Sequence, residues 1–226
     1  QSPEMFEEVV TAADEGGFKY LLMPVNATCW EATVTASFYA ARSKHIAPLI
    51  ALRSGYCNPS LSAKMYATLD QLTGGRLCIN LIAGISDADT QADGISDSKQ
   101  VRYEKMDEEV EIMKRLWASN EPISDEGKHY QVNQVIEPKP LQKPHPPIWI
   151  PGFGSSETIE WCAHPDRKYT YLAVYMPESL VKMYFDMYRE CADKFGYTAS
   201  PYQLGHVYPV YVGETDAKAE QEARDH

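Results

Sequence analysis

The chain has 226 residues, of which 44% are hydrophobic and 23% are charged, and its formal net charge is −11 at pH 7. This composition can supply a sizeable core, while the acidic balance and the lack of a basic block argue against nucleic acid and anionic membranes as partners. No apolar run approaches the roughly 20 residues that span a bilayer, so we expect no membrane-spanning segment.

Segments with helical spacing alternate with short apolar runs along the chain. The first helix carries Phe6, Val9, Val10 and Ala13 on one face and stops at Gly16-Gly17. The predicted strands, in chain order, are 20–25, 46–52, 77–83, 148–150, 170–175 and 207–212. The later predicted helices are 31–42, 59–72, 103–117, 158–163, 179–195 and 216–224.

Two segments interrupt this alternation. Residues 84–101 are rich in Asp, Ser and Gly and are predicted to form a polar loop, a candidate lid. Residues 118–147 are predicted to be an excursion between strands, with a short hairpin around residues 127–130 and a proline-rich return.

Repeated strand–helix alternation predicts right-handed crossovers and a parallel sheet. An open doubly wound sheet and a (β/α)₈ barrel both fit this pattern. A barrel of about 250 residues has eight strands, whereas six are predicted here, with a helix at each end of the chain. We therefore expect one incomplete barrel domain over residues 1–226 that lacks the first and last strands; a complete six-stranded open sheet is the alternative.

The stretch Gly152-Phe-Gly-Ser-Ser156 follows the predicted strand 148–150 and precedes a helix. Glycines permit a tight turn, and a serine before a helix caps its N-terminus. Backbone N–H groups at such a terminus can hold an anion. Taken alone, these residues favour a plain helix cap over an anion site.

Three more side chains are candidates for a site. Asn80 interrupts an apolar strand, where a buried amide needs partners; Tyr103 stands at the start of a helix; Cys29 lies in the loop after the strand 20–25. A satisfied core amide, a packed aromatic ring and a small apolar thiol are the structural alternatives.

Cysteine and histidine usage points to no metal site. The five cysteines are scattered, without a C-x-x-C pair, which argues against a disulfide framework or a zinc site and favours a reducing, cytoplasmic location. His145 has no second histidine or carboxylate at ligand spacing, so we expect it to be structural.

Four stretches, taken in order, resemble the bacterial-luciferase-like flavin-dependent monooxygenases, closest to the alkanesulfonate and long-chain-alkane branch. They are NATCWEAT (26–33), SGYCNPSLSAKMYATLDQLTGGRLCINLIAG (54–84), ADG with RYEKMDEEVEIMKRLW (92–117), and GKHYQV with PKPLQKPHPPIWIPGFGSSET (127–158). The resemblance implies a luciferase-like (β/α)₈ TIM barrel that uses reduced FMN. The sulfonate enzymes carry Arg and His where this chain has Val207 and Pro209, so sulfonate specificity is not implied.

The resemblance also implies roles for the candidate residues. Gly154, Ser155 and Ser156 would hold the FMN phosphate, Asn80 would face the flavin ring or ribityl chain, and Tyr103 would donate a hydroxyl to the phosphate or ribityl group. Cys29 would line the active site and tune the oxygenated flavin. Arg102 is expected instead to pair with a neighbouring surface carboxylate.

The implied reaction is an FMNH₂- and O₂-dependent monooxygenation of a small organic substrate through a peroxyflavin. A separate flavin reductase would deliver the reduced FMN, since the sequence shows no nicotinamide fingerprint, and a homo-oligomer is expected at full length. The alternatives are a deazaflavin-dependent hydride-transfer enzyme of the same fold and a non-catalytic flavin-binding relative. A metal-dependent barrel hydrolase is disfavoured by the lack of clustered His and Asp.

Overall fold

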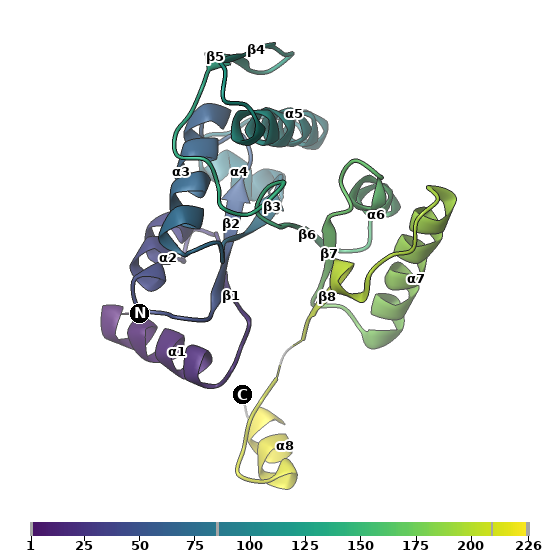
Figure 1. Cartoon of the computed structure of the whole chain (residues 1–226). Helices are drawn as coiled ribbons and strands as arrows, with labels where there is room; N and C mark the ends of the chain where they lie inside the picture. The colour runs from purple at the N-terminus through teal and green to yellow at the C-terminus, as the bar shows by residue number, and fades with distance from the viewer. Residues whose placement is uncertain (1, 85, 209, 225–226) are drawn as a thin grey trace. The chain divides into compact units, whose positions relative to one another are not determined.

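The computed structural model describes residues 2–84, 86–208 and 210–224. These residues belong to two compact units, Gln1–Ile150 and Pro151–His226. Each unit contains parallel strands and helices that alternate along the chain (Figure 1). None of the helices in the described ranges is both long and apolar enough to cross a membrane.

The first unit is built on a parallel sheet in which the strands follow one another in chain order. Its strands are β1 (Tyr20–Met23), β2 (Ala47–Arg53), β3 (Cys78–Ile82) and β6 (Ile148–Gly152), whose last residues belong to the second unit. The connections carry α1 (Pro3–Glu15), α2 (Ala32–Ala40), α3 (Pro59–Leu72), α4 (Asp87–Ala92) and α5 (Lys99–Ala118). Because parallel neighbours need crossover connections, this pattern confirms the predicted βα alternation.

Most of these helices begin at a polar cap. Ser2, Asn58, Ser86 and Ser98 precede α1, α3, α4 and α5, and each side chain accepts a hydrogen bond from a backbone N–H of the first turn. Such caps satisfy donors that have no partner inside the helix. They fix where each helix starts, and hence the length of each loop that follows a strand.

Side chains of the sheet alternate between two faces. On one face, Ala47, Leu49 and Cys78 form a buried cluster against which Tyr20 and Trp149 pack. These five residues lie in the amino-terminal half of the sheet. The register pairs Leu49 with Cys78, Ala51 with Asn80 and Asn80 with Trp149, so Ala51 and Asn80 lie on the same face, nearer its carboxyl edge.

The excursion contains a small antiparallel hairpin, as predicted. Its strands are β4 (Ile123–Glu126) and β5 (Gln131–Gln134). Glu108 of α5 accepts hydrogen bonds from the backbone N–H groups of His129 (3.1 Å) and Tyr130 (2.7 Å) in the turn. The hairpin is therefore fixed to α5 by a carboxylate.

The second unit continues from the end of β6. Its elements are α6 (Ser156–Ala163), β7 (Thr170–Val174), α7 (Glu178–Lys194), a 3₁₀ turn (Pro201–Gln203), β8 (Leu204–Val207) and α8 (Asp216–Arg224). The strand order is β6-β7-β8, and Tyr171 of β7 pairs with Leu204 of β8. Helix α7 packs on α6, and its Tyr188 hydroxyl donates to the carbonyl of Tyr169 (2.8 Å).

Two predicted segments are wrong in their bounds. The last strand was expected at residues 207–212, but β8 covers Leu204–Val207, while Val210 and Val212 are exposed; Pro209 lies outside the described residues. The predicted polar loop 84–101 contains α4 and the start of α5. The physical reason in the second case is a set of ion pairs that hold α4.

Candidate active site at the carboxyl ends of the strands

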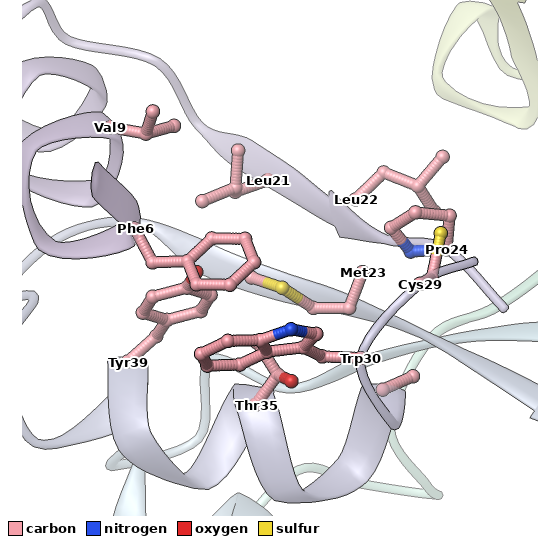
Figure 2. A pocket seen from close by; sticks show the side chains of 11 residues that line it. Phe6, Val9, Leu21, Leu22, Met23, Pro24, Cys29, Trp30, Thr35 and Tyr39 are labelled. Carbon is pink, nitrogen blue, oxygen red and sulfur yellow. The ribbon is translucent and has the colours of Figure 1, made fainter. Parts of the chain in front are cut away.

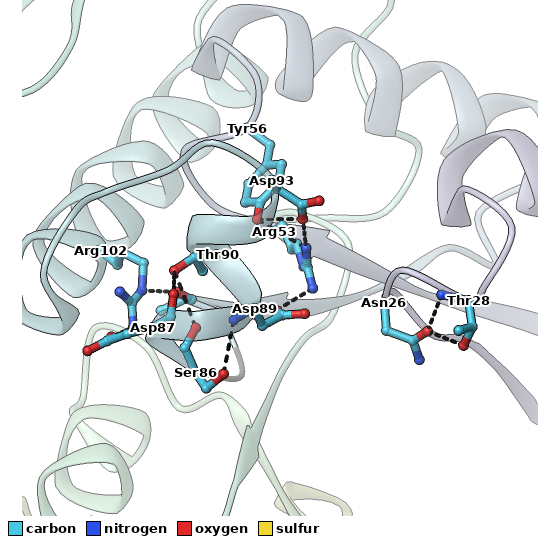
Figure 3. A network of polar contacts seen from close by, with 11 residues as sticks. Asn26, Thr28, Arg53, Tyr56, Ser86, Asp87, Asp89, Thr90, Asp93 and Arg102 are labelled. Carbon is cyan, nitrogen blue, oxygen red and sulfur yellow. Dashed lines mark hydrogen bonds and ion pairs between the residues drawn. The ribbon is translucent and has the colours of Figure 1, made fainter.

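The loops that follow β1, β2 and β3 leave the sheet at one edge, its carboxyl edge. In parallel α/β folds this edge is where active sites are built. The loops are residues 24–31, 54–58 and, around α4, the described residues 83–84 and 86–98; they carry most of the polar contacts drawn in Figure 3. We therefore take this edge of the first unit as the candidate site.

Asn80 lies within β3 and is only 4% exposed. Its amide oxygen Oδ1 is buried and accepts no hydrogen bond from the residues that the structure describes. The neighbours across the pairing are Ala51 of β2, whose side chain has no donor, and Trp149 of β6, whose indole N–H makes no hydrogen bond to this oxygen. The structural alternative of a satisfied core amide is thus wrong for this oxygen.

Arg53 ends β2 and holds α4 against the carboxyl edge. Its side chain is nearly buried and forms ion pairs with Asp89 (2.5 Å) and with Asp93. Arg53 also donates to the Tyr56 hydroxyl (3.0 Å), which in turn donates to Asp93 (3.0 Å). Figure 3 shows the guanidinium between the two carboxylates.

These contacts set the charge states of the group. Burial alone would lower the pKa of Arg53, but the hydrogen bond and charge of Asp89, with Asp93 and Tyr56, raise it above its ordinary value. Burial, followed by the hydrogen bond to Asp93, raises the pKa of the Tyr56 phenol. Both side chains therefore stay protonated and act as donors near pH 7.

Arg102 fixes the other end of the same loop. Its guanidinium donates to the carbonyls of Ala83 (2.9 Å) and Asp97 (2.7 Å) and pairs with Asp87 (2.8 Å). Arg102 does pair with a nearby carboxylate, but the expected surface position is wrong, because the side chain is buried. Arg53 and Arg102 together therefore fix α4 and the flanking residues Ala83 and Asp97 by ion pairs and hydrogen bonds.

Cys29 lies at one end of an apolar pocket of about 140 Å³. The pocket lies between α1, β1 and α2, and Figure 2 shows Cys29 beside Pro24, with Phe6 at the opposite end. The residues that line it are Phe6, Val9, Leu21, Leu22, Met23, Pro24, Cys29, Trp30, Ala32, Thr35 and Tyr39. The predicted site cysteine is therefore in a largely apolar environment, half-buried and without a disulfide partner.

Tyr103 lies in the second turn of α5 and is partly exposed. The Lys99 ammonium lies 5.8 Å from the centre of its ring. Asn80 thus lies in β3, Cys29 in the loop after β1 and Tyr103 in α5, and their predicted roles toward the flavin remain predictions.

Gly154, Ser155 and Ser156 are brought together by the turn between β6 and α6. Gly154 has φ 101°, and a Cβ there would lie 2.2 Å from the Tyr184 hydroxyl oxygen, so glycine is required. Ser155 caps α6 by accepting from Thr158 N (3.4 Å), and its hydroxyl donates to Glu157 (2.6 Å). The predicted cap is confirmed, and the predicted anion role remains a prediction.

The sequence reasoning did not single out Arg53, Asp89 and Asp93 as site residues. One signal was available: an arginine directly after the apolar run Ile46–Leu52 is a charge at the end of a buried strand, and such a charge needs partners. As for metals, no group of three or more His, Cys, Asp or Glu residues in the described ranges could hold an ion.

Comparison with known proteins places this geometry in a known class. The family described as luciferase-like monooxygenase matches residues 1–226. Among solved structures, the monooxygenase RslO1 from Streptomyces bottropensis has a TM-score of 0.83 at 23% identity, over 98% of this chain and 69% of that one. The oxygenating constituent of 3,6-diketocamphane monooxygenase from Pseudomonas putida, in complex with FMN, has a TM-score of 0.84 at 18% identity, over 100% and 67% of the two chains.

The long-chain alkane monooxygenase LadA has a TM-score of 0.83 at 19% identity, and this chain covers 60% of its length. Likeness at such identities shows the fold: the six parallel strands of the described ranges form part of the luciferase-like (β/α)₈ barrel that the sequence resemblance implied, as expected for an incomplete barrel. The chain spans 69%, 67% and 60% of these three structures.

Proposed function

We propose that this chain, which belongs to the luciferase-like monooxygenase family, binds reduced FMN and uses molecular oxygen to oxygenate a small organic substrate. Membership of the family rests on the match over residues 1–226. The proposal adds three points to this membership: the cofactor is reduced, the oxidant is O₂, and the substrate is a small organic molecule.

Asn80 is the observation that supports this proposal most directly. A buried amide oxygen without a partner is rare, because leaving one unsatisfied costs about 1–3 kcal/mol, and that of Asn80 has none among the described residues. An isoalloxazine ring carries N–H groups that would donate to such an oxygen. The group therefore fits the residue, and Asn80 would hold the ring or the ribityl chain.

The phosphate is assigned to the turn Gly154–Ser156 of the second unit. Backbone N–H groups at the start of α6 and the exposed Ser156 hydroxyl would donate to it, and the helix dipole favours an anion. Glu157 now accepts the Ser155 hydroxyl (2.6 Å), so a phosphate at this turn would replace that contact. Tyr103 keeps its proposed role as a further hydroxyl donor to the flavin.

Bound reduced FMN supplies two electrons to O₂, so that one oxygen atom enters the substrate and the other leaves as water. The chain itself must bind and orient both molecules and keep water away. Arg53 and Arg102 hold α4 and its flanking residues over the carboxyl edge, which limits the access of solvent. Cys29, beside an apolar pocket, is proposed to line the substrate side.

Partners and location follow from the same proposal. A separate flavin reductase would supply the reduced FMN, and a homo-oligomer is proposed for the whole protein. The five cysteines are all free, which supports a reducing compartment and hence a cytoplasmic location.

The test combines flavin binding with oxygen consumption. The chain is titrated with FMN while flavin fluorescence is followed, and oxygen uptake is then measured with reduced FMN and a panel of small alkanes, ketones and amines. Saturable binding and substrate-dependent uptake, with an oxygenated product, are expected. Binding of a deazaflavin without FMN binding, or no flavin binding at all, would overturn the proposal.

A further inference from the structure

Glu109 of α5 is a fully buried carboxylate, 0% exposed. It accepts hydrogen bonds from the Ser54 hydroxyl (2.7 Å), the Gly55 backbone N–H (3.0 Å) and the Ser62 hydroxyl (2.9 Å). One acidic side chain thus joins α5, α3 and the loop that follows β2. No ion pair links it to a cation in the part of the chain that the structure describes.

The partners indicate an ionised carboxylate. Three donors point at its two oxygens, whereas a protonated carboxyl group would place a fourth hydrogen among them. Burial raises the pKa of Glu109, and the three hydrogen bonds oppose that shift without cancelling it. The charged form is therefore held by geometry, and it is protonated at a higher pH than the carboxylate of an exposed glutamate.

The loop fixed by Glu109 leads directly to the rim of the candidate site. Ser54 and Gly55 lie between Arg53 and Tyr56. Arg53 forms ion pairs with Asp89 and Asp93 at α4, a group of contacts that we call the Arg53 clamp, and the Tyr56 hydroxyl donates to Asp93 (3.0 Å). A shift of the Ser54–Gly55 backbone would move both Arg53 and Tyr56. The rim at the carboxyl ends of β2 and β3 thus depends on a side chain that does not itself reach it.

Stability alone does not explain a charge at this position. An apolar side chain packed between α3 and α5 would avoid the desolvation of a carboxylate, and replacing buried charges by well-packed apolar groups is often neutral or stabilising. The Glu109 carboxylate instead holds the Ser54 hydroxyl, the Gly55 N–H and the Ser62 hydroxyl in one arrangement. The benefit is one defined conformation of the loop.

We propose that Glu109 is a positioning residue: its carboxylate fixes the loop 54–58 and, through Arg53 and Tyr56, the place of α4 at the rim of the site. The proposal rests on the proposed function only for its effect on flavin binding. Its effects on the loop and on α4 are independent of any ligand.

The first arm uses amide hydrogen exchange of the whole chain without flavin. In Glu109→Gln, a neutral amide oxygen replaces the carboxylate oxygen that accepts from both Ser54 and Gly55. A hydrogen bond to a neutral acceptor is weaker than one to an ionised acceptor, so the Gly55 amide should exchange about tenfold faster, and amides of α4 such as Thr90 should also exchange faster. The matched control is Glu111→Gln, on the same helix but half-exposed and paired with Lys114 (2.9 Å), which should change neither. Unchanged Gly55 exchange, or a change confined to Gly55 with α4 unaffected, would overturn the proposal.

The second arm is the pH profile of Gly55 exchange, corrected for intrinsic rates. Protection should fall as the pH drops through the raised pKa of Glu109 and should not depend on pH in Glu109→Gln. The titratable groups facing Glu109 are Cys57 of the loop, Tyr66 of α3 and Tyr130 of the hairpin turn, whose pKa values are raised, mainly by burial, so they stay neutral in this range. The other carboxylates around this group are Glu31, near Cys57 and Tyr66, and Glu108 and Asp97, near Tyr130.

Ser62→Ala keeps the carboxylate but removes one donor to its charged form, so the midpoint of the profile should move to higher pH. This variant tests the role of the Glu109 carboxylate even if Glu109→Gln fails to fold, and an unmoved midpoint would overturn the proposal.

In a final arm, FMN affinity should fall in Glu109→Gln and stay unchanged in Glu111→Gln. If the unmodified chain does not bind FMN, the proposed function fails while the exchange arms still judge Glu109; if it binds and Glu109→Gln binds equally well, the positioning role fails.

Discussion

Arg53 at the end of β2 and Asp89 in α4 form an ion pair with an N···O distance of 2.5 Å, although 36 residues separate them in the chain. The guanidinium is almost fully buried, while Asp89 is partly exposed. Through this pair and the neighbouring Asp93, the loop after β3 is anchored to the strand beside it.

The double substitution Asp89→Asn with Asp93→Asn should destabilise the protein strongly. It leaves the buried Arg53 charge without a carboxylate partner, and breaking a buried pair in this way costs about 3 kcal/mol. Urea denaturation measures the loss. Asp186→Asn, which removes the exposed pairs with Lys182 and Arg189, is the control and should have a much smaller effect; equal losses would show that the Arg53 clamp is not a buried pair in solution.

Asn80→Leu should stabilise the flavin-free protein and weaken flavin binding. The substitution removes a buried, unpartnered amide oxygen, which should raise the free energy of unfolding by about 1 kcal/mol. The loss of an acceptor for a flavin N–H should raise the Kd for FMN up to about tenfold. Both are measured on one sample by thermal unfolding and fluorescence titration, with Asn133→Leu, at an exposed position of β5, as the control. A stabilised variant with unchanged FMN affinity would remove Asn80 from the flavin site.

Ser155→Ala combined with Ser156→Ala should weaken FMN binding more than riboflavin binding. The two hydroxyls are proposed to meet the phosphate, which riboflavin lacks. Removing the Ser155 cap should also cost about 1 kcal/mol of stability, so Ser98→Ala, which removes the cap of α5, is the matched control. Equal losses of affinity for the two flavins would refute the phosphate assignment.

Glu104 predicts a pH effect at the hairpin. Its carboxylate accepts from Lys128 (2.7 Å) and Gln100 (3.0 Å) and contacts His129 Nε2 (3.1 Å); these contacts, that of Lys128 first, lower its pKa from 4.5 to about 2. Because the folded-state pKa is lowered, the stabilisation is complete above pH 4.5 and is lost as the pH falls toward about 2.

Lys128→Ala should therefore raise the pKa of Glu104 toward its ordinary value, as an NMR titration of the carboxyl carbon would show. Lys182→Ala, on α7, should leave that titration unchanged. A Glu104 midpoint that already lies near 4.5 in the unmodified protein would mean that the hairpin is not held by these contacts.

The sequence predicted the strands best where apolar residues are nearly continuous. The predicted segment 77–83 contains all of β3, and 46–52 nearly matches β2, because a strand buried on both faces needs no polar positions. The last strand was misplaced for the same reason: Gly205 and His206 interrupt the apolar pattern of β8, whereas the apolar residues Val210 and Val212 beyond it are exposed.

The candidate site was predicted less completely than the fold. Asn80 stood out because an amide in an apolar run is conspicuous, and its unsatisfied oxygen agrees with that reading. The ion pairs of Arg53 were not predicted because Asp93 and Arg53 lie 40 residues apart, and the sequence of a polar loop does not indicate which cation its carboxylates will pair with. Glu109 was not singled out, since only packing shows that it is buried.

β1 pairs with β2 alone in the described ranges, and the apolar pocket of α1, β1 and α2 opens beside it. An open strand edge next to apolar side chains is a template on which a strand of another molecule can add. Wherever no further strand covers this edge, aggregation of the purified chain should therefore be bimolecular, with a rate that rises with the square of the protein concentration, and a short soluble peptide that pairs with the edge should slow it.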